Sequence, residues 1–167
     1  FVGDGQNGRI VISTDNGSSF SSVTSNTSNH LYGVTFGNNT FVGDGQNGRI
    51  VISTDNGSSF SSVTSNTSNH LYAVTFGNNT FVGVGQNGKI VRSTDSGSTW
   101  NSMTSPISTH IRGVTFGNNT FVGVGNDGKI VRSSDNGSSW DNSTSPTSNH
   151  LYDVTFGNNT FVGVGQN

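Results

Sequence analysis

The chain has 167 residues, enough for one ordinary domain, and carries a formal net charge of −2 from 7 basic and 9 acidic residues. Without a basic excess, nucleic-acid binding is not expected, and no apolar run approaches the length of a membrane span. The absence of cysteine excludes disulfides and thiolate metal sites. It leaves the compartment open, and we favour an extracellular or periplasmic one.

The hydrophobic content is low, at 28%, which can indicate disorder. However, the chain contains 11 Phe, 3 Tyr and 2 Trp, and disordered chains usually lack such aromatic residues. Gly, Ser, Thr and Asn make up much of the remainder, a composition typical of short strands joined by tight turns. We therefore expect an ordered, strand-rich protein.

A unit of 40 residues repeats along the chain, since FVGDGQNGRI begins at positions 1 and 41 and close variants begin at 81 and 121. The first two units differ only at Gly33 and Ala73, which indicates recent duplication or deliberate design. A period of this size is typical of solenoids, propellers and similar arrays. The chain is therefore one repeat domain, 1–167, with the units 1–40, 41–80, 81–120 and 121–160 and a partial unit, 161–167.

Each unit is predicted to hold four short strands. In chain order, the apolar segments LYGVTF (31–36) and TFVGDG (40–45) are separated by a GNN turn, and the Asn-Gly pair of the following QNG favours a two-residue hairpin. RIVIST (49–54) is the third strand, the weaker FSSVTS (60–65) is the fourth, and NTSNH (66–70) crosses to the next unit. No window shows helical periodicity.

Four antiparallel strands in about 40 residues match one blade of a β-propeller. Blades pack face to face, which explains why segments such as KIVR and LYGVTF are apolar on both sides instead of alternating. We therefore predict an all-β fold, a β-propeller of four-stranded antiparallel blades with four blades' worth per chain. A stacked β-solenoid is the alternative.

The two ends of the chain suggest how a ring would close. The chain opens on a second strand, 1–5, and ends on another, 161–165, so both termini together would supply one blade and leave one second strand in excess. Since propellers usually have about four to eight blades, the ring is closed by both termini or completed by a second chain. We expect a homo-oligomer of two chains sharing a ring, because the surplus strand would otherwise expose unpaired backbone groups. A segment of a longer array is the alternative.

The motif S-[ST]-D-x-G-S-[ST]-[FW] recurs at 13–20, 53–60, 93–100 and 133–140, and it resembles the Asp-box, or BNR repeat, of sialidase-type and Ycf48-like propellers. The Asp can accept hydrogen bonds from backbone N–H groups, the Gly can adopt positive φ, and the aromatic residue can anchor the turn in the core, so we predict a structural role. Phe20 and Phe60 stand where the resembled family usually has Trp. The residues concerned are Asp15, Gly17, Phe20, Asp55, Gly57, Phe60, Asp95, Gly97, Trp100, Asp135, Gly137 and Trp140.

The resemblance raises sialidase chemistry as a candidate function. The resembled enzymes use an arginine cluster, a Tyr nucleophile paired with Glu, and an acidic Asp, but this sequence contains no Glu, and four of its 9 acidic residues lie in the repeated motif. Glycosidases generally need two carboxyl groups a few ångströms apart in distinct environments. Near-identical units also disfavour a single asymmetric catalytic centre. We therefore expect no enzyme activity, no catalytic residue and no cofactor.

A binding face is expected at the end opposite the aspartate motif, where the QNG hairpins and the crossing segments meet. Amide groups beside aromatic rings suit the hydroxyls and C–H faces of sugars, and one weak site per blade gains avidity through multivalency. Four His residues would surround the channel mouth, where neutral imidazoles could share a metal only in a small ring, and no metal site is predicted. The candidates are Gln6, Asn7, His30, Tyr32, Gln46, Asn47, His70, Tyr72, Gln86, Asn87, His110, Asn126, His150 and Tyr152.

The function favoured by the sequence is therefore multivalent, lectin-like recognition of glycans. A protein-interaction or assembly scaffold of the Ycf48-like type is the alternative, and a highly repetitive amplified or engineered propeller without a selected ligand is a third. Glycans or a protein are the expected partners, without nucleic acid and without membrane insertion.

Overall fold

The computed structural model describes residues 2–167 and shows a chain of antiparallel sheets, which confirms the predicted all-β class. Three sheets have four strands each and form complete blades. They are β4–β7 (Leu31–Gly37, Thr40–Gly45, Ile50–Ser53, Ser61–Val63), β8–β11 (Leu71–Gly77, Thr80–Gly85, Ile90–Ser93, Asn101–Met103) and β12–β15 (Ile111–Gly117, Thr120–Gly125, Ile130–Ser133, Asp141–Ser143).

An incomplete sheet lies at each end of the chain. The first is β1–β3 (Val2–Asp4, Ile10–Ile12, Ser21–Val23) and the last is β16–β17 (Leu151–Gly157, Thr160–Gly165). Four short 3-10 turns complete the regular structure, η1 (Gln6–Gly8), η2 (Gln46–Gly48), η3 (Gln86–Gly88) and η4 (Asn126–Gly128). In residues 2–167 no helix has the length and apolarity needed to span a membrane.

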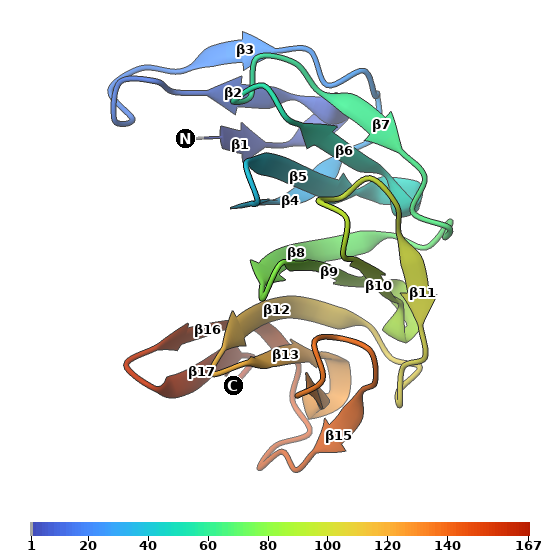
Figure 1. The fold of residues 1–167 in the computed structure, drawn as a ribbon. Helices are drawn as coiled ribbons and strands as arrows, with labels where there is room; N and C mark the ends of the chain where they lie inside the picture. Colours follow the sequence, from blue (N-terminus) through green and yellow to red (C-terminus); the bar gives the residue numbers. More distant parts are fainter. Residues whose placement is uncertain (1) are drawn as a thin grey trace.

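The sheets follow one another along an open arc, with β1–β3 at one end and β16–β17 at the other (Figure 1). The first strands of the units, β4, β8, β12 and β16, contact one another in sequence and therefore form the inner edge of the arc. Within the described residues, β16–β17 do not pair with β1–β3, so the two ends of this chain do not close a ring by themselves.

The outer two strands of each blade are shorter than the sequence predicts. In the first complete blade the third strand is Ile50–Ser53 and the fourth is only Ser61–Val63. The chain leaves the sheet after Val63 because it turns toward the hairpin that joins the second and third strands. There the Ser65 hydroxyl donates a hydrogen bond of 2.5 Å to the Gly48 carbonyl oxygen.

The hairpin after the second strand has the predicted Asn-Gly turn. Asn47 (φ 57°, ψ 35°) and Gly48 (φ 68°) are both left-handed, and the Arg49 N–H donates to the Gln46 carbonyl oxygen at 3.1 Å. Glycine is required at the second position, because a Cβ on Gly48 would overlap the carbonyl oxygen of Thr67. The turn is thereby held directly against the segment that crosses to the next blade.

The repeated aspartate motif forms a closed turn between the third and fourth strands. The Asp55 carboxylate accepts hydrogen bonds from the Ser53 hydroxyl (2.7 Å), the Ser59 N–H (3.0 Å) and the Ser59 hydroxyl (2.6 Å). These donors, above all Ser59, lower the pKa of Asp55 to about 2. Gly57 has φ +83° and donates its N–H to Ser53 Oγ at 2.9 Å. We refer to these segments as the aspartate turns.

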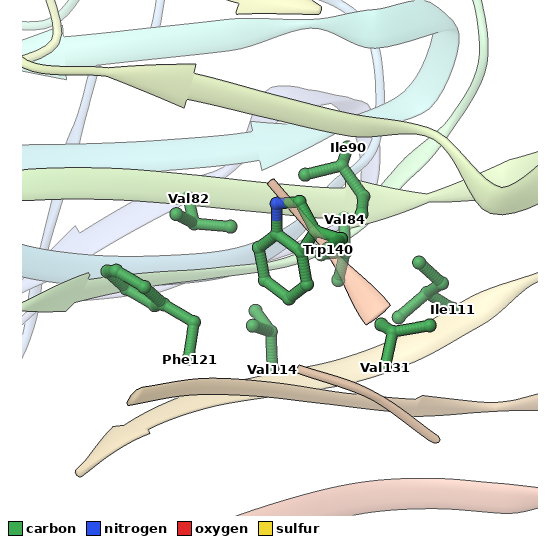
Figure 2. Close-up of a cluster of buried hydrophobic side chains, with 8 residues drawn as sticks. All are labelled: Val82, Val84, Ile90, Ile111, Val114, Phe121, Val131 and Trp140. Atoms are coloured by element: carbon green, nitrogen blue, oxygen red, sulfur yellow. The ribbon is translucent and has the colours of Figure 1, made fainter. Parts of the chain in front are cut away.

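The hydrophobic core lies between blades rather than within one blade. Trp140, which follows the last aspartate turn, packs in a cluster with Val82 and Val84 of the preceding blade and with Val114 and Phe121 of its own (Figure 2). Such burial of a large aromatic side chain removes roughly 150–250 Å² from water. The aspartate-turn aromatics Phe60, Trp100 and Trp140 thus each join their own blade to the one before it.

One of the four predicted aromatic anchors is not buried. Phe60, Trp100 and Trp140 are 1%, 1% and 6% exposed, but Phe20 is 53% exposed. The prediction is wrong for Phe20 because no sheet precedes β1–β3 within the described residues. The two Trp residues add a polar contact that Phe lacks, for example from Trp100 Nε1–H to the Gly97 carbonyl oxygen at 2.9 Å.

Candidate functional site

Each inner strand that begins a unit carries an irregularity at its second residue. In β8, Leu71 pairs with Gly85 and Ala73 with Val84, so Tyr72 lies between them at a register shift. The same shift recurs in β4, β12 and β16. Such bulges re-aim a side chain out of the ladder, and they are common beside functional sites. The residues at the shifts are Tyr32, Tyr72, Arg112 and Tyr152.

We call these side chains and the neighbouring histidines the inner rim. Their contacts are continuous from His30 to Arg112, and His150 and Tyr152 hold the equivalent positions in the last unit. The ring centroids of Tyr32 and Tyr72 are 6.0 Å apart, and those of Tyr72 and His110 are 5.9 Å apart. The Arg112 guanidinium carbon lies 5.2 Å from the Tyr72 centroid, within range of a cation–π contact. The inner rim comprises His30, Tyr32, His70, Tyr72, His110, Arg112, His150 and Tyr152.

The inner rim is open to solvent although its rings touch one another. Tyr32 is 44% exposed and Tyr152 is 51% exposed. Tyr72 is half-buried between its neighbours on both sides. A row of partly exposed, mutually supported rings offers aromatic surface to a ligand at little cost in side-chain entropy, because few rotamers remain to be lost.

The four histidines have a structural role as well as a place in the inner rim. Each Nδ1 accepts a hydrogen bond from a backbone N–H of the preceding hairpin, for example Asn47 N–H to His70 Nδ1 at 2.9 Å and Asn87 N–H to His110 Nδ1 at 3.1 Å. An accepting Nδ1 places the proton of the neutral ring on Nε2. In the described part of the chain, no three His or Asp side chains gather closely enough to hold a metal ion.

Several predicted ligand-binding amides are partly engaged within the protein. The side-chain oxygens of Gln46 and Gln86 accept the N–H groups of His30 and His70, at 3.4 and 3.2 Å. The Asn126 side-chain oxygen accepts the Arg112 Nε–H at 2.9 Å. These groups orient the inner rim. Exposed side chains at the hairpin tips remain available to a ligand, namely Gln6, Asn7, Asn47 and Asn87.

A second feature repeats on the outer side of the same end. Polar pockets of about 300, 290 and 340 Å³ lie between a hairpin turn and the crossing segment of its unit, and we call them the outer pockets. The first two are lined by residues 7–9 with 22–27 and by 47–49 with 62–67. Each of the three contains one cation, Arg9, Arg49 or Lys129.

The cations of the outer pockets have no carboxylate partner. Within residues 2–167 no Arg or Lys side chain forms an ion pair with a carboxylate, and His150 Nδ1, which accepts the Asp127 N–H, lies 3.8 Å from Asp127 Oδ1. Arg49 Nε is buried without a hydrogen-bond partner, whereas Arg9 Nη1–H donates to Ser22 Oγ at 3.1 Å. The sequence analysis did not single out these cations. Their 40-residue spacing is the signal that could have identified them.

Comparison with solved structures shows the same fold. The chain superposes on "YCF48 bound to D1 peptide" with a TM-score of 0.71 and 19% identity, over 93% of this chain and 53% of that chain. For YCF48 from Cyanidioschyzon merolae the values are 0.69 and 14%, over 96% and 59%. The computationally designed Ika4 protein gives 0.67 and 15%, over 86% and 91%. The chain thus spans just over half the length of the YCF48 chains.

At the level of sequence, no curated protein matches the chain. A family model described as the DUF6242 beta propeller domain matches residues 33–160. This match begins within β4, covers the rest of the three complete blades and extends into the last sheet. The protein therefore belongs to the DUF6242 beta propeller domain family.

Proposed function

We propose that the chain is a non-enzymatic docking module that binds an extended polypeptide segment along the inner rim. The observation that carries this proposal is the contiguous row from Tyr32 through Tyr72 to Arg112, with ring spacings near 6 Å and a guanidinium at its end. Aromatic residues and arginine are the side chains that most often dominate protein interfaces. The similar fold of YCF48, which has been solved with a D1 peptide, supports a peptide ligand.

The expected peptide presents an apolar or aromatic side chain to the tyrosines and a carboxylate to Arg112. The Nε–H of Arg112 donates to Asn126 Oδ1, which fixes the plane of the guanidinium, so that its terminal nitrogens could bind a carboxylate in a forked geometry. A lysine could not provide this geometry.

Selection of random dodecapeptides displayed on phage tests this proposal. Selected peptides are expected to lose at least about tenfold in affinity toward Tyr72→Ala and toward Arg112→Gln, as expected for central interface side chains. Arg132→Gln is the matched control, because Arg132 is an exposed cation on β14 outside the inner rim. Failure to enrich any peptide, or peptides that bind the Tyr72→Ala variant as tightly as the native chain, would contradict the proposal.

Glycan recognition is the second candidate, and the outer pockets favour it. Each has the volume of a single sugar residue plus water, and in two of them hydroxyls line a pocket that also holds an arginine. An unpaired cation beside hydroxyl groups suits an acidic sugar. We expect weak binding to dextran sulfate and none to neutral dextran, with Arg49→Gln reducing it and Arg132→Gln leaving it unchanged. The absence of binding both to a glycan array and to dextran sulfate would rule out this candidate.

We also propose that the aspartate turns are Asp-boxes with a structural role, and that the working form is a homo-oligomer of two chains sharing one ring. The first proposal is supported by the closed set of hydrogen bonds around Asp55, in which both carboxylate oxygens accept hydrogen bonds from the turn itself. The second would double the number of inner-rim sites on one assembly and thereby raise avidity.

A further inference from the structure

An apolar cavity of about 360 Å³ lies where β16–β17 meet the last complete blade. Its apolar walls include Val122, Val124, Ile130, Leu151, Val154 and Phe161. Each lies 40 residues beyond a member of the cluster around Trp140, namely Val82, Val84, Ile90, Ile111, Val114 and Phe121 (Figure 2). The cavity is therefore the repeat equivalent of the space that a tryptophan fills one blade earlier. We call it the terminal cavity.

The same chain carries an exposed aromatic side chain of the matching kind. Phe20 holds the position in the aspartate motif that Trp140 holds in the last one, and it is 53% exposed. We propose that the terminal cavity binds Phe20 of a second copy of this chain. This inference rests on the two-chain ring proposed above and names the residues that join its halves.

A second pair of residues matches across the same junction. Inside the arc, Phe116 packs so closely over Gly77 that a Cβ on the glycine would overlap the ring, and Phe156 covers Gly117 in the same way. At the ends of the arc, a Cβ on Gly157 would meet nothing within 4 Å, and Phe36 is 50% exposed. Gly157 of one copy therefore offers Phe36 of the other copy the same contact surface that Gly77 offers Phe116.

The junction also completes a blade. β16 and β17 supply its first two strands, and β2 and β3 of the second copy supply the third and fourth, in the order seen in every complete blade. Either β17 or the second copy's β1 fills the second position. β17 fits better, because Val164 then holds the position at which Val84 and Val124 are buried in the complete blades, whereas β1 would place the Asp4 carboxyl there. Val164, now 58% exposed, would be covered by the next blade.

The interface is head-to-tail, so the two contacting surfaces are different and each copy uses both. Such interfaces generate closed rings when the rotation closes and open fibres when it does not. Two arcs that meet at both ends bury the aromatic side chains Phe20 and Phe36 twice per assembly. The open edge of β17 becomes paired at the same time with β2 of the second copy, in place of that copy's β1, which removes a site of nonspecific association.

Sedimentation velocity of the 167-residue chain tests the inference. We expect a discrete species of twice the 17.4 kDa chain mass. The double variant Phe20→Ala/Phe36→Ala and the variant Gly157→Phe, which blocks the surface for Phe36, should sediment as folded monomers with a native circular dichroism spectrum. Phe20→Trp should tighten association, since Trp100 and Trp140 fill the equivalent spaces in the interior of the chain.

Val63→Ala is the matched control, because it removes half-buried apolar surface from the middle of the chain and should leave association unchanged. The inference would be overturned if the native chain stayed monomeric at all concentrations or grew into open-ended fibres. Unchanged association of the double variant would also overturn it. Peptide binding by the monomeric variants is measured in parallel. Loss of the ring with retained peptide binding separates this inference from the proposed function.

Discussion

Gly33 lies directly across the β4–β5 pair from Asp44, and a methyl group on Gly33 would approach Asp44 Oδ1 to 2.8 Å. In the next blade the equivalent pair is Ala73 and Val84. Asp44 is 0% exposed, and neither of its carboxylate oxygens has a hydrogen-bond partner. The glycine thus provides the space that this carboxyl occupies, and the two positions depend on each other.

Asp44 makes stability depend on pH in the opposite sense to an ordinary surface carboxylate. Burial, with a smaller contribution from the charge of Asp4, raises the pKa of Asp44 well above its usual value. Its contribution is therefore most favourable below the unfolded-state pKa of about 4 and is lost as pH rises through the folded-state value. We expect Asp44→Val to stabilise the protein by about 1–3 kcal/mol at neutral pH and by less near pH 4. Thermal melting of both chains across this range checks the prediction, with Asp44→Asn as the uncharged control. A difference in melting temperature between the native chain and Asp44→Val that stays the same at every pH would contradict the prediction.

The coupling between Gly33 and Asp44 is open to a double-mutant cycle. Gly33→Ala alone should cost about 1–3 kcal/mol, because its methyl group meets a carboxyl that has no room to move. In the Asp44→Val background the cost should nearly vanish, since Ala and Val already face each other at Ala73 and Val84. Urea unfolding of the four chains gives the coupling energy. Additive effects would show that the two sites are independent.

The aspartate turns are expected to affect stability without affecting binding. Asp95 accepts hydrogen bonds from the Ser93 hydroxyl (2.8 Å), the Thr99 N–H (2.9 Å) and the Thr99 hydroxyl (2.6 Å), at the end of the blade opposite the inner rim. Asp95→Ala should lower the free energy of unfolding by about 1–2 kcal/mol and leave peptide affinity unchanged. Unfolding and binding measured on one preparation check this. Lost binding with unchanged stability would reverse the assignment.

The histidine hydrogen bonds predict one tautomer at all four sites. Because Nδ1 accepts a backbone N–H in every unit, including Asn7 to His30 (3.3 Å) and Asp127 to His150 (3.1 Å), the neutral rings carry hydrogen on Nε2. Nitrogen-15 chemical shifts of the imidazoles at neutral pH should show this form. A mixture of tautomers at His70, where the contact is shortest, would mean that the bond does not form in solution.

Much of the fold follows from the sequence because its signals are local. Period-40 repetition, Asn-Gly turns and β-branched runs identify the strands of each blade, and Thr40–Gly45 begins and ends where predicted. The error at Phe20 has a different origin. Burial of that ring depends on a neighbouring sheet, and a motif that recurs in all four units says nothing about which unit has a neighbour.

The inner-rim residues that we propose for binding were only partly predictable for a similar reason. The sequence places His30 and Tyr32 at one end of the blade, but it did not single out Arg112, because the β-bulge at this position is a property of paired strands. Nor does the sequence show that Gln46 is engaged by the backbone of His30 while the cation at Arg49 remains unpaired. Such differences arise only when the crossing segment packs on the hairpin.

All strand pairs in the described chain join strands that are consecutive in sequence. Loop closure is therefore short at every step, and each sheet can assemble quickly from its own hairpins. The proposed junction between copies would be the exception, because its rate would depend on how often two chains meet. Refolding of this protein should then show a fast phase that is independent of concentration, followed by a slower bimolecular phase that appears only when Phe20 is present to be buried.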